Sequence, residues 1–133
     1  MEPAWDTRRV PLACDALAPD GSQIRLLPSV GRGSMVHCTL ATGAVTRAVR
    51  HRSVDELWLC LGGRGQVWRR RDDVEQIVDV ERDVALSIPV GTAFQFRATG
   101  NEPLRLVIVT MPPWPGDEEA IFVEGAWEAK LRP

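Results

Sequence analysis

The chain has 133 residues, which is enough for one domain with a single hydrophobic core. Hydrophobic residues make up 44% and charged residues 26% of the sequence, which argues against a disordered chain and indicates a globular one. The formal net charge of −2 provides no positive field for phosphate groups, so neither nucleic acid nor an anionic membrane surface is expected as a partner.

The cysteines and the N-terminal residues bear on the cellular location. Cys14, Cys38 and Cys60 are far apart and form no C-x-x-C pair, so we expect neither a disulfide framework nor a zinc site. The first residues lack the basic and apolar segments of a signal peptide, and no apolar run approaches the ~20 residues of a membrane span. We therefore expect a cytoplasmic protein with reduced thiols.

Turn-forming residues divide the chain into short segments, from Asp20-Gly21 near the start to Gly100-Asn101 near the end. The segments between the turns are rich in β-formers and show no helical period, which predicts an all-β sandwich or barrel. Residues 117–130 are expected to form a short helix or a coil, because Trp114-Pro115-Gly116 ends any element before them. The predicted strands are 34–40, 44–51, 57–61, 66–70, 76–80, 94–97 and 104–110.

Two spaced motifs lie within these strands. Gly43, His51, Glu56 and Gly63 stand at the intervals of the first cupin motif, but Val49 takes the place of that motif's first histidine. In the second motif the proline and glycine are present as Pro89 and Gly91, while Phe94 stands at the histidine position and Ala98 at the asparagine position. The sequence therefore resembles a small single-domain cupin in which two of the four metal ligands are missing.

The resemblance implies a fold and a domain organisation. Residues 1–133 should form one cupin domain, a double-stranded β-helix (jelly-roll barrel). The core barrel should cover roughly residues 30–110, with an N-terminal arm at 1–29 and a C-terminal tail at 111–133.

Strand geometry predicts which residues line the barrel. Side chains two positions apart share a face, so Arg47, Val49 and His51 should point inward together. By the same argument Glu56 and Trp58 face the interior, and Phe94 and Phe96 form the opposite wall. The result is a mostly apolar cavity with a few polar groups, which is the usual composition of a small-molecule site.

Three residues leave alternatives open. Gln95 would replace Phe94 in the cavity if its strand shifted by one residue. His37, on an earlier strand, is either structural or a recruited metal ligand. Arg47 is either a pocket anchor for an acidic ligand, a partner for Glu56, or a solvated strand residue.

The leading functional hypothesis is a metal-independent enzyme that acts on a small, largely apolar molecule. A histidine beside a buried carboxyl group can move protons near neutral pH, so His51 and Glu56 are the predicted catalytic pair for isomerisation, cyclisation, dehydration or decarboxylation. One imidazole and one carboxylate fall short of a catalytic metal site, so no metal and no other cofactor is expected. The predicted substrate-binding residues are Arg47, Val49, Trp58, Phe94, Phe96, His37 and Gln95.

Two other functions remain open. One is a metal-dependent dioxygenase or isomerase that uses His51, Glu56 and a recruited third ligand. The other is a non-catalytic binding module. Small cupins of this kind resemble accessory enzymes of secondary metabolism, and they commonly form homodimers. The expected partners are therefore a small-molecule substrate and a second copy of the chain, with Trp5, Trp114 and Trp127 as apolar contact area.

Overall fold

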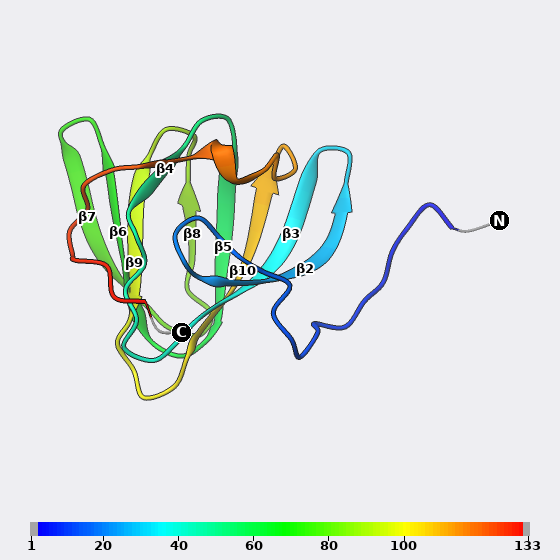
Figure 1. Ribbon diagram of the computed structural model, residues 1–133, viewed down its shortest axis with the longest axis horizontal. Coiled ribbons are helices and arrows are strands. Elements are labelled where there is room, and N and C mark those ends of the chain that lie inside the picture. Colours follow the sequence, from blue (N-terminus) through cyan, green and yellow to red (C-terminus); the bar gives the residue numbers. More distant parts are fainter. Residues whose placement is uncertain (1–2, 132–133) are drawn as a thin grey trace.

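The computed structural model describes residues 3–131, which form two antiparallel sheets that face each other (Figure 1). The first sheet has the strand order β1-β2-β3-β10-β5-β8, and the second has the order β11-β4-β9-β6-β7. The predicted all-β, jelly-roll fold is confirmed. The strands are β1 (Ala16–Leu17), β2 (Gln23–Val30), β3 (Gly33–Leu40), β4 (Val49–His51), β5 (Asp55–Gly62), β6 (Gly65–Arg71), β7 (Val74–Val80), β8 (Ala85–Ile88), β9 (Ala93–Ala98), β10 (Leu104–Met111) and β11 (Ala120–Phe122).

Alternation of buried and exposed side chains places the strands around one core. In β5 the side chains of Glu56, Trp58 and Cys60 are buried, whereas the residues between them are exposed. β10 lies between β3 and β5, and its register aligns Thr110 with both Ser34 and Glu56. One row of inward-facing side chains across the first sheet is thus polar. The rows farther from it are apolar and contribute Val36, Cys38, Leu106, Ile108 and Trp58 to the core.

Gly63, the last residue of the first motif, is required by a close crossing of two chain segments. Its φ is 75°, and a Cβ at this position would come within 2.3 Å of the carbonyl oxygen of Pro103. The glycine spacing that identifies the motif therefore has a steric reason, because this turn leads β5 into β6 beside the loop before β10.

The C-terminal segment covers the outer face of the second sheet. After a 3-10 turn, η1 (Asp117–Glu119), and strand β11, residues 123–131 run along this sheet and form no α-helix (Figure 1). Val123 and Trp127 pack there against Ala48, Trp68 and Ala93. Both faces of β9 are therefore covered, one by the core and one by the tail. No helix within residues 3–131 has the length and the apolar character needed to cross a membrane.

Two predicted boundaries were wrong. Residues 44–51 do not form one strand, because Val45 makes isolated bridges to Arg97 and Lys130 and regular pairing starts at Val49. The barrel also begins before residue 30, because β2 pairs with β3 over nearly its whole length and β1 adds a further strand. These edge segments have exposed and half-buried side chains, so their hydrophobic pattern was too weak to predict them.

Candidate functional site

A cavity of about 570 Å³ lies between the two sheets. Its walls come from β2, β3, β4, β5, β9 and β10, from the loop after β10, and from the turn before β2. This volume is within the usual range for sites that bind small molecules. The wall is mainly apolar, with contributions from Ile24, Val36, Val49, Trp58, Phe94, Ile108 and Trp114. Its buried polar side chains are Asp20, Ser22, His51, Glu56 and Thr110.

His51 and Glu56 face each other inside this cavity. His51 ends β4 and Glu56 is the second residue of β5, so the short turn between these strands brings the two side chains together. His51 Nδ1 lies 3.7 Å from Glu56 Oε2, which is too far for a hydrogen bond. Glu56 Oε1 accepts a hydrogen bond of 2.8 Å from the Trp58 indole, whereas His51 Nδ1 is enclosed and has no partner among the described residues.

Burial makes both groups neutral. It lowers the pKa of His51 to about 4, and the charge of Glu119 opposes this fall. Burial also raises the pKa of Glu56 to about 8; the hydrogen bond from Trp58 opposes this rise and the charge of Asp20 adds to it. The 3.7 Å separation would allow an ion pair, but between these pKa values neither group carries a charge. A neutral imidazole beside a protonated carboxyl group is therefore the state near neutral pH.

Two aromatic rings hold the imidazole in place. Phe94 and Trp114 each make an edge-to-face contact with His51, with ring centroids 5.2 Å away in both cases. Trp114 comes from the loop after β10, and its backbone N–H donates to Ser34 Oγ. The sequence analysis did not place Trp114 in the cavity. The sequence signal that could have placed Trp114 there is its position in the proline-rich segment directly after the last core strand.

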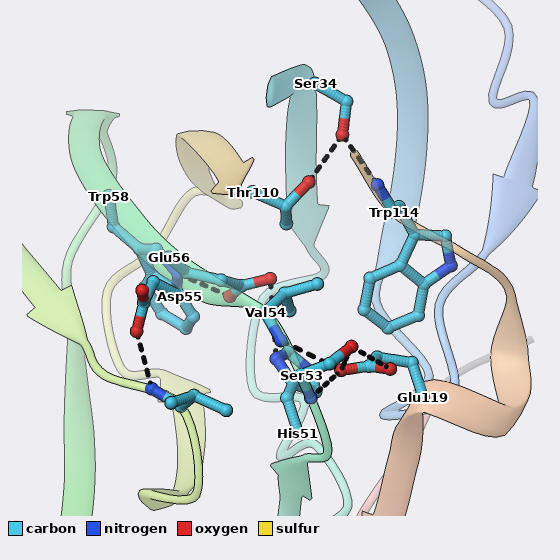
Figure 2. A network of polar contacts seen from close by, with 11 residues as sticks. Ser34, His51, Ser53, Val54, Asp55, Glu56, Trp58, Thr110, Trp114 and Glu119 are labelled. Atoms are coloured by element: carbon cyan, nitrogen blue, oxygen red, sulfur yellow. Dashed lines mark hydrogen bonds and ion pairs between the residues drawn. The ribbon is translucent and has the colours of Figure 1, made fainter. Parts of the chain in front are cut away.

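Glu119 fixes the turn that carries His51 and Glu56 (Figure 2). Its carboxylate accepts hydrogen bonds from the backbone N–H groups of Ser53 and Val54 and from the Ser53 hydroxyl. Burial alone would raise the pKa of Glu119, but these hydrogen bonds outweigh it and lower the pKa. The sequence analysis missed this residue, because its partners are more than sixty positions away in the chain.

A pair of hydroxyl groups extends the polar row next to Glu56. Ser34 Oγ and Thr110 Oγ1 are hydrogen-bonded to each other, and both residues line the cavity (Figure 2). On the other side, Asp55 Oδ1 accepts a hydrogen bond of 2.8 Å from Val90 N, which ties the start of β5 to the turn of the second motif. Glu56 is thus aligned with Thr110 of β10, and the residue before it anchors the start of β5.

Four of the predicted wall residues lie at or next to the cavity. Val49, Trp58 and Phe94 line it. Phe96 is fully buried but lies deeper, where it packs against Trp58 at a centroid distance of 5.0 Å. The register is settled by the pairing of Val49 with Phe94, so the strand does not shift and Phe94 faces the interior.

Three other predicted residues lie outside the cavity. Gln95 faces the opposite side of β9, where its amide exchanges two hydrogen bonds with the backbone of Trp127. His37 faces away from the core, beside Arg25 and Arg105 of the neighbouring strands. The predicted inward direction of Arg47 was wrong: this residue is exposed and its guanidinium contacts Pro19 O at 3.5 Å. Strand alternation does not reach Arg47, because β4 starts two residues later.

The sequence around this cavity matches a known family, since residues 36–110 fit the Cupin domain. The chain belongs to the cupin family. It is 26% identical over 111 residues to an uncharacterised protein of Methanocaldococcus jannaschii, a match that covers 80% of this chain and 86% of that protein. The crystal structure of BH2720 from Bacillus halodurans is similar with a TM-score of 0.64 and 28% identity, over 70% of this chain and 72% of that one.

More distant cupin structures share the fold alone. Oxalate decarboxylase from Bacillus subtilis aligns with a TM-score of 0.71 at 16% identity, over 83% of this chain and 30% of that one.

The residues present do not fit the metal that cupins commonly bind. Val49 and Phe94 stand at two of the ligand positions, and their direct cross-strand pairing makes this part of the wall apolar. His51 and Glu56 supply one imidazole and one carboxyl group, fewer than the three protein ligands of a typical catalytic site. Neither His37 nor Gln95 reaches the cavity. Within residues 3–131 no three His, Cys, Asp or Glu side chains are placed to hold a metal ion.

Proposed function

We propose that this cupin is an enzyme that moves protons on a small, largely apolar carbonyl compound, with Glu56 as the acid and His51 as the base. The observation that carries the proposal is the pair itself: a neutral imidazole with an unpartnered Nδ1, 3.7 Å from a protonated carboxyl group, in an apolar cavity. A ligand carbonyl oxygen would accept the hydrogen bond that the protonated Glu56 can donate, and the carbon next to it would then face the free His51 Nδ1. Opposite pKa shifts in neighbouring groups are a frequent property of acid–base pairs.

The chemistry follows from these protonation states. Glu56 donates its proton to the carbonyl oxygen while His51 takes a proton from the adjacent carbon, which gives an enol, a carboxylate and an imidazolium. Return of the two protons regenerates the enzyme, and return to a different carbon completes an isomerisation. Cyclisation and dehydration begin with the same proton transfers. The surrounding aromatic wall keeps water from the enol.

This reaction can be tested without the natural substrate. In D₂O, the wild-type protein should catalyse deuterium exchange at the carbon next to the carbonyl of 4-phenyl-2-butanone, followed by NMR. His51→Ala and Glu56→Gln should each reduce this exchange about 10²–10⁴-fold. His37→Gln is the matched control, because it removes a buried histidine on the outer face of the sheet. A wild-type rate equal to the buffer rate, with the ketone bound, would instead identify a non-catalytic binding module.

The metal-independent part of the proposal has its own test. Elemental analysis of protein purified without a chelator should find well below one metal ion per chain, and chelation should leave the exchange rate unchanged. Stoichiometric iron, manganese, nickel or zinc, removed together with the activity, would support the metal-dependent alternative.

We also propose that the protein is a homodimer. Trp5 and Leu12 are exposed on the N-terminal arm, which extends away from the barrel (Figure 1), and Val30 is exposed on the β2–β3 hairpin. Trp114 and Trp127 do not add to this surface, because one lines the cavity and the other packs under Arg97. Light scattering should give about twice the monomer mass of 14.7 kDa, and a monomer mass at micromolar concentration would contradict the proposal.

A further inference from the structure

Asp20 lies in a turn that spans the gap between the two sheets. The turn precedes β2 and is closed by hydrogen bonds from Ala18 N to Ser22 O and from Gly21 N to Ala18 O. Gly21 has a φ of 97°, which suits a residue without a side chain. The carbonyl of Asp20 accepts a hydrogen bond from Arg47 N, in the segment that leads to β4. The first sheet is thereby joined to the second sheet at the cavity wall.

The carboxyl group of Asp20 is buried, but only one of its two oxygens accepts hydrogen bonds. Its Oδ1 accepts hydrogen bonds from Ser22 N at 2.9 Å and from Ser22 Oγ at 2.7 Å. Within residues 3–131 no hydrogen bond and no ion pair reaches Oδ2, yet this atom is not among the enclosed polar atoms without partners. Since Asp20 lines the cavity and is 8% exposed, Oδ2 remains accessible to a molecule bound there.

Within residues 3–131 no cation forms an ion pair with this carboxyl group. The positive charge of Arg47 acts on Asp20 from a distance. Its guanidinium contacts the carbonyl of Pro19 and forms no ion pair with Asp20. Burial raises the pKa of Asp20, and hydrogen bonds from Ser22 together with the Arg47 charge oppose that rise. Burying a carboxylate with an unused oxygen costs free energy unless another group completes its hydrogen bonds. Here the remaining position opens into a cavity of about 570 Å³.

We propose that Asp20 is a second ligand-binding residue of this cavity, whose Oδ2 accepts a hydrogen bond from a hydroxyl or amine group of the ligand. The protonated Glu56 offers a donor elsewhere in the same cavity, and apolar side chains including Ile24, Val36 and Ile108 line the wall. The ligand class is therefore an apolar-bodied carbonyl compound that also carries a hydroxyl or amine donor. That the ligand carries a carbonyl group rests on the proposed function. That it carries a hydroxyl or amine donor rests on Asp20 alone.

Three compounds that share the same carbon skeleton test whether the ligand donates a hydrogen bond to Asp20. These are 4-(4-hydroxyphenyl)-2-butanone, its methyl ether, and 4-phenyl-2-butanone, with dissociation constants measured by titration calorimetry or NMR. The wild-type protein should bind the hydroxyl compound about 10- to 100-fold more tightly than either of the others, as expected when a buried acceptor otherwise lacks a donor. Asp20→Asn keeps an acceptor for Ser22 but offers an amide donor to the ligand, so the preference should fall below about threefold.

Control variants separate this inference from the proposed function. Asp83→Asn makes the same change at an exposed carboxylate outside the cavity wall and should keep the wild-type preference. Glu56→Gln should weaken all three ketones similarly while preserving the preference for the hydroxyl compound. If Asp20→Asn unfolds, Ser22→Ala provides a second variant, because it removes a donor that orients Asp20 and should reduce the preference.

Equal wild-type affinity for the hydroxyl compound and its ether, or a preference that survives in Asp20→Asn, would overturn the inference. So would the absence of measurable binding of all three probes up to their solubility limits. Loss of exchange activity in Glu56→Gln with an intact hydroxyl preference would support both proposals independently.

Discussion

Glu56 and Glu119 are two buried glutamates of the same barrel, exposed by only 6% and 5%, and their environments have opposite effects. Glu119 accepts hydrogen bonds from two backbone N–H groups and a hydroxyl, and its pKa is lowered. Glu56 accepts one hydrogen bond, from Trp58, and burial raises its pKa to about 8. The donors directed at Glu119 outweigh its desolvation, whereas the single donor to Glu56 does not outweigh the desolvation of that carboxyl group.

The difference in hydrogen bonding also gives the two glutamates different roles. The Glu119 carboxylate uses its oxygens in hydrogen bonds to the turn between β4 and β5, so it has little capacity left to bind a ligand. Glu56 keeps an oxygen without a hydrogen bond, and its position depends on that same turn. One glutamate therefore stabilises the arrangement that makes the other available for chemistry.

The largest expected effect is on proton transfer. In the deuterium-exchange assay, Glu56→Gln should lose about 10²–10⁴-fold in rate, and the double variant His51→Ala/Glu56→Gln should lose little more than the worse single variant, because the two residues act as a unit. Glu119→Gln should lose much less, since it acts through the geometry of the turn. Equal losses in Glu56→Gln and Glu119→Gln would show that the comparison between them is wrong.

The same substitution should have opposite effects on stability. Glu119→Gln removes the charge from three hydrogen bonds and should lower the free energy of unfolding by about 1–3 kcal/mol at pH 7. Glu56→Gln should leave it level or raise it, because the amide replaces a carboxyl group whose charged form is unfavourable inside the barrel. Denaturant unfolding of both variants measures the difference. A strong destabilisation by Glu56→Gln would indicate a structural role for Glu56.

The pH dependence of stability should reveal the raised pKa of Glu56. The folded state holds this proton up to about pH 8 and the unfolded state only up to about pH 4.5, so Glu56 stabilises the fold below pH 4.5 and this contribution is lost as the pH rises toward 8. His51, with a pKa of about 4 against 6.5, acts in the opposite direction between those values. The two effects offset each other from pH 4.5 to 6.5.

Above pH 6.5 the His51 effect has ended, and the Glu56 effect by itself should lower wild-type stability by on the order of 1 kcal/mol per pH unit up to pH 8. Glu56→Gln should flatten this fall, which unfolding measurements at pH 6.5 and 8 will show. A slope that is unchanged in Glu56→Gln would place the titrating group elsewhere.

The smallest expected effect is on stability, and it compares two buried threonine hydroxyls in place of the two glutamates. Thr110 shares a hydrogen bond with Ser34, whereas the hydroxyl of Thr92 is buried without a partner within the described part of the chain. Thr110→Val should therefore cost about 1 kcal/mol of stability, and Thr92→Val should be neutral or stabilising. Thermal unfolding of the two variants provides the measurement, and a larger loss for Thr92→Val would contradict this account.

Local spacing explains what the sequence could predict. Turn residues and β-rich segments identified most strands, and period-two alternation correctly placed Val49, His51, Glu56, Trp58 and Phe94 on the inner face. These inferences succeeded because each depends on residues close together in one strand. The same rule was wrong for Arg47, where the chain is not yet a regular strand.

The sequence by itself determined the all-β fold, the two motifs and the inward direction of His51 and Glu56, because strand periodicity and turn sterics are local properties. Only the tertiary structure decided that Gln95 faces the tail, that Trp114 packs on His51, that Glu119 holds the turn between β4 and β5, and that Asp20 enters the cavity. Each of those positions depends on segments that are distant in the chain. Their meeting is fixed by the pairing and packing of whole strands, which no local pattern records.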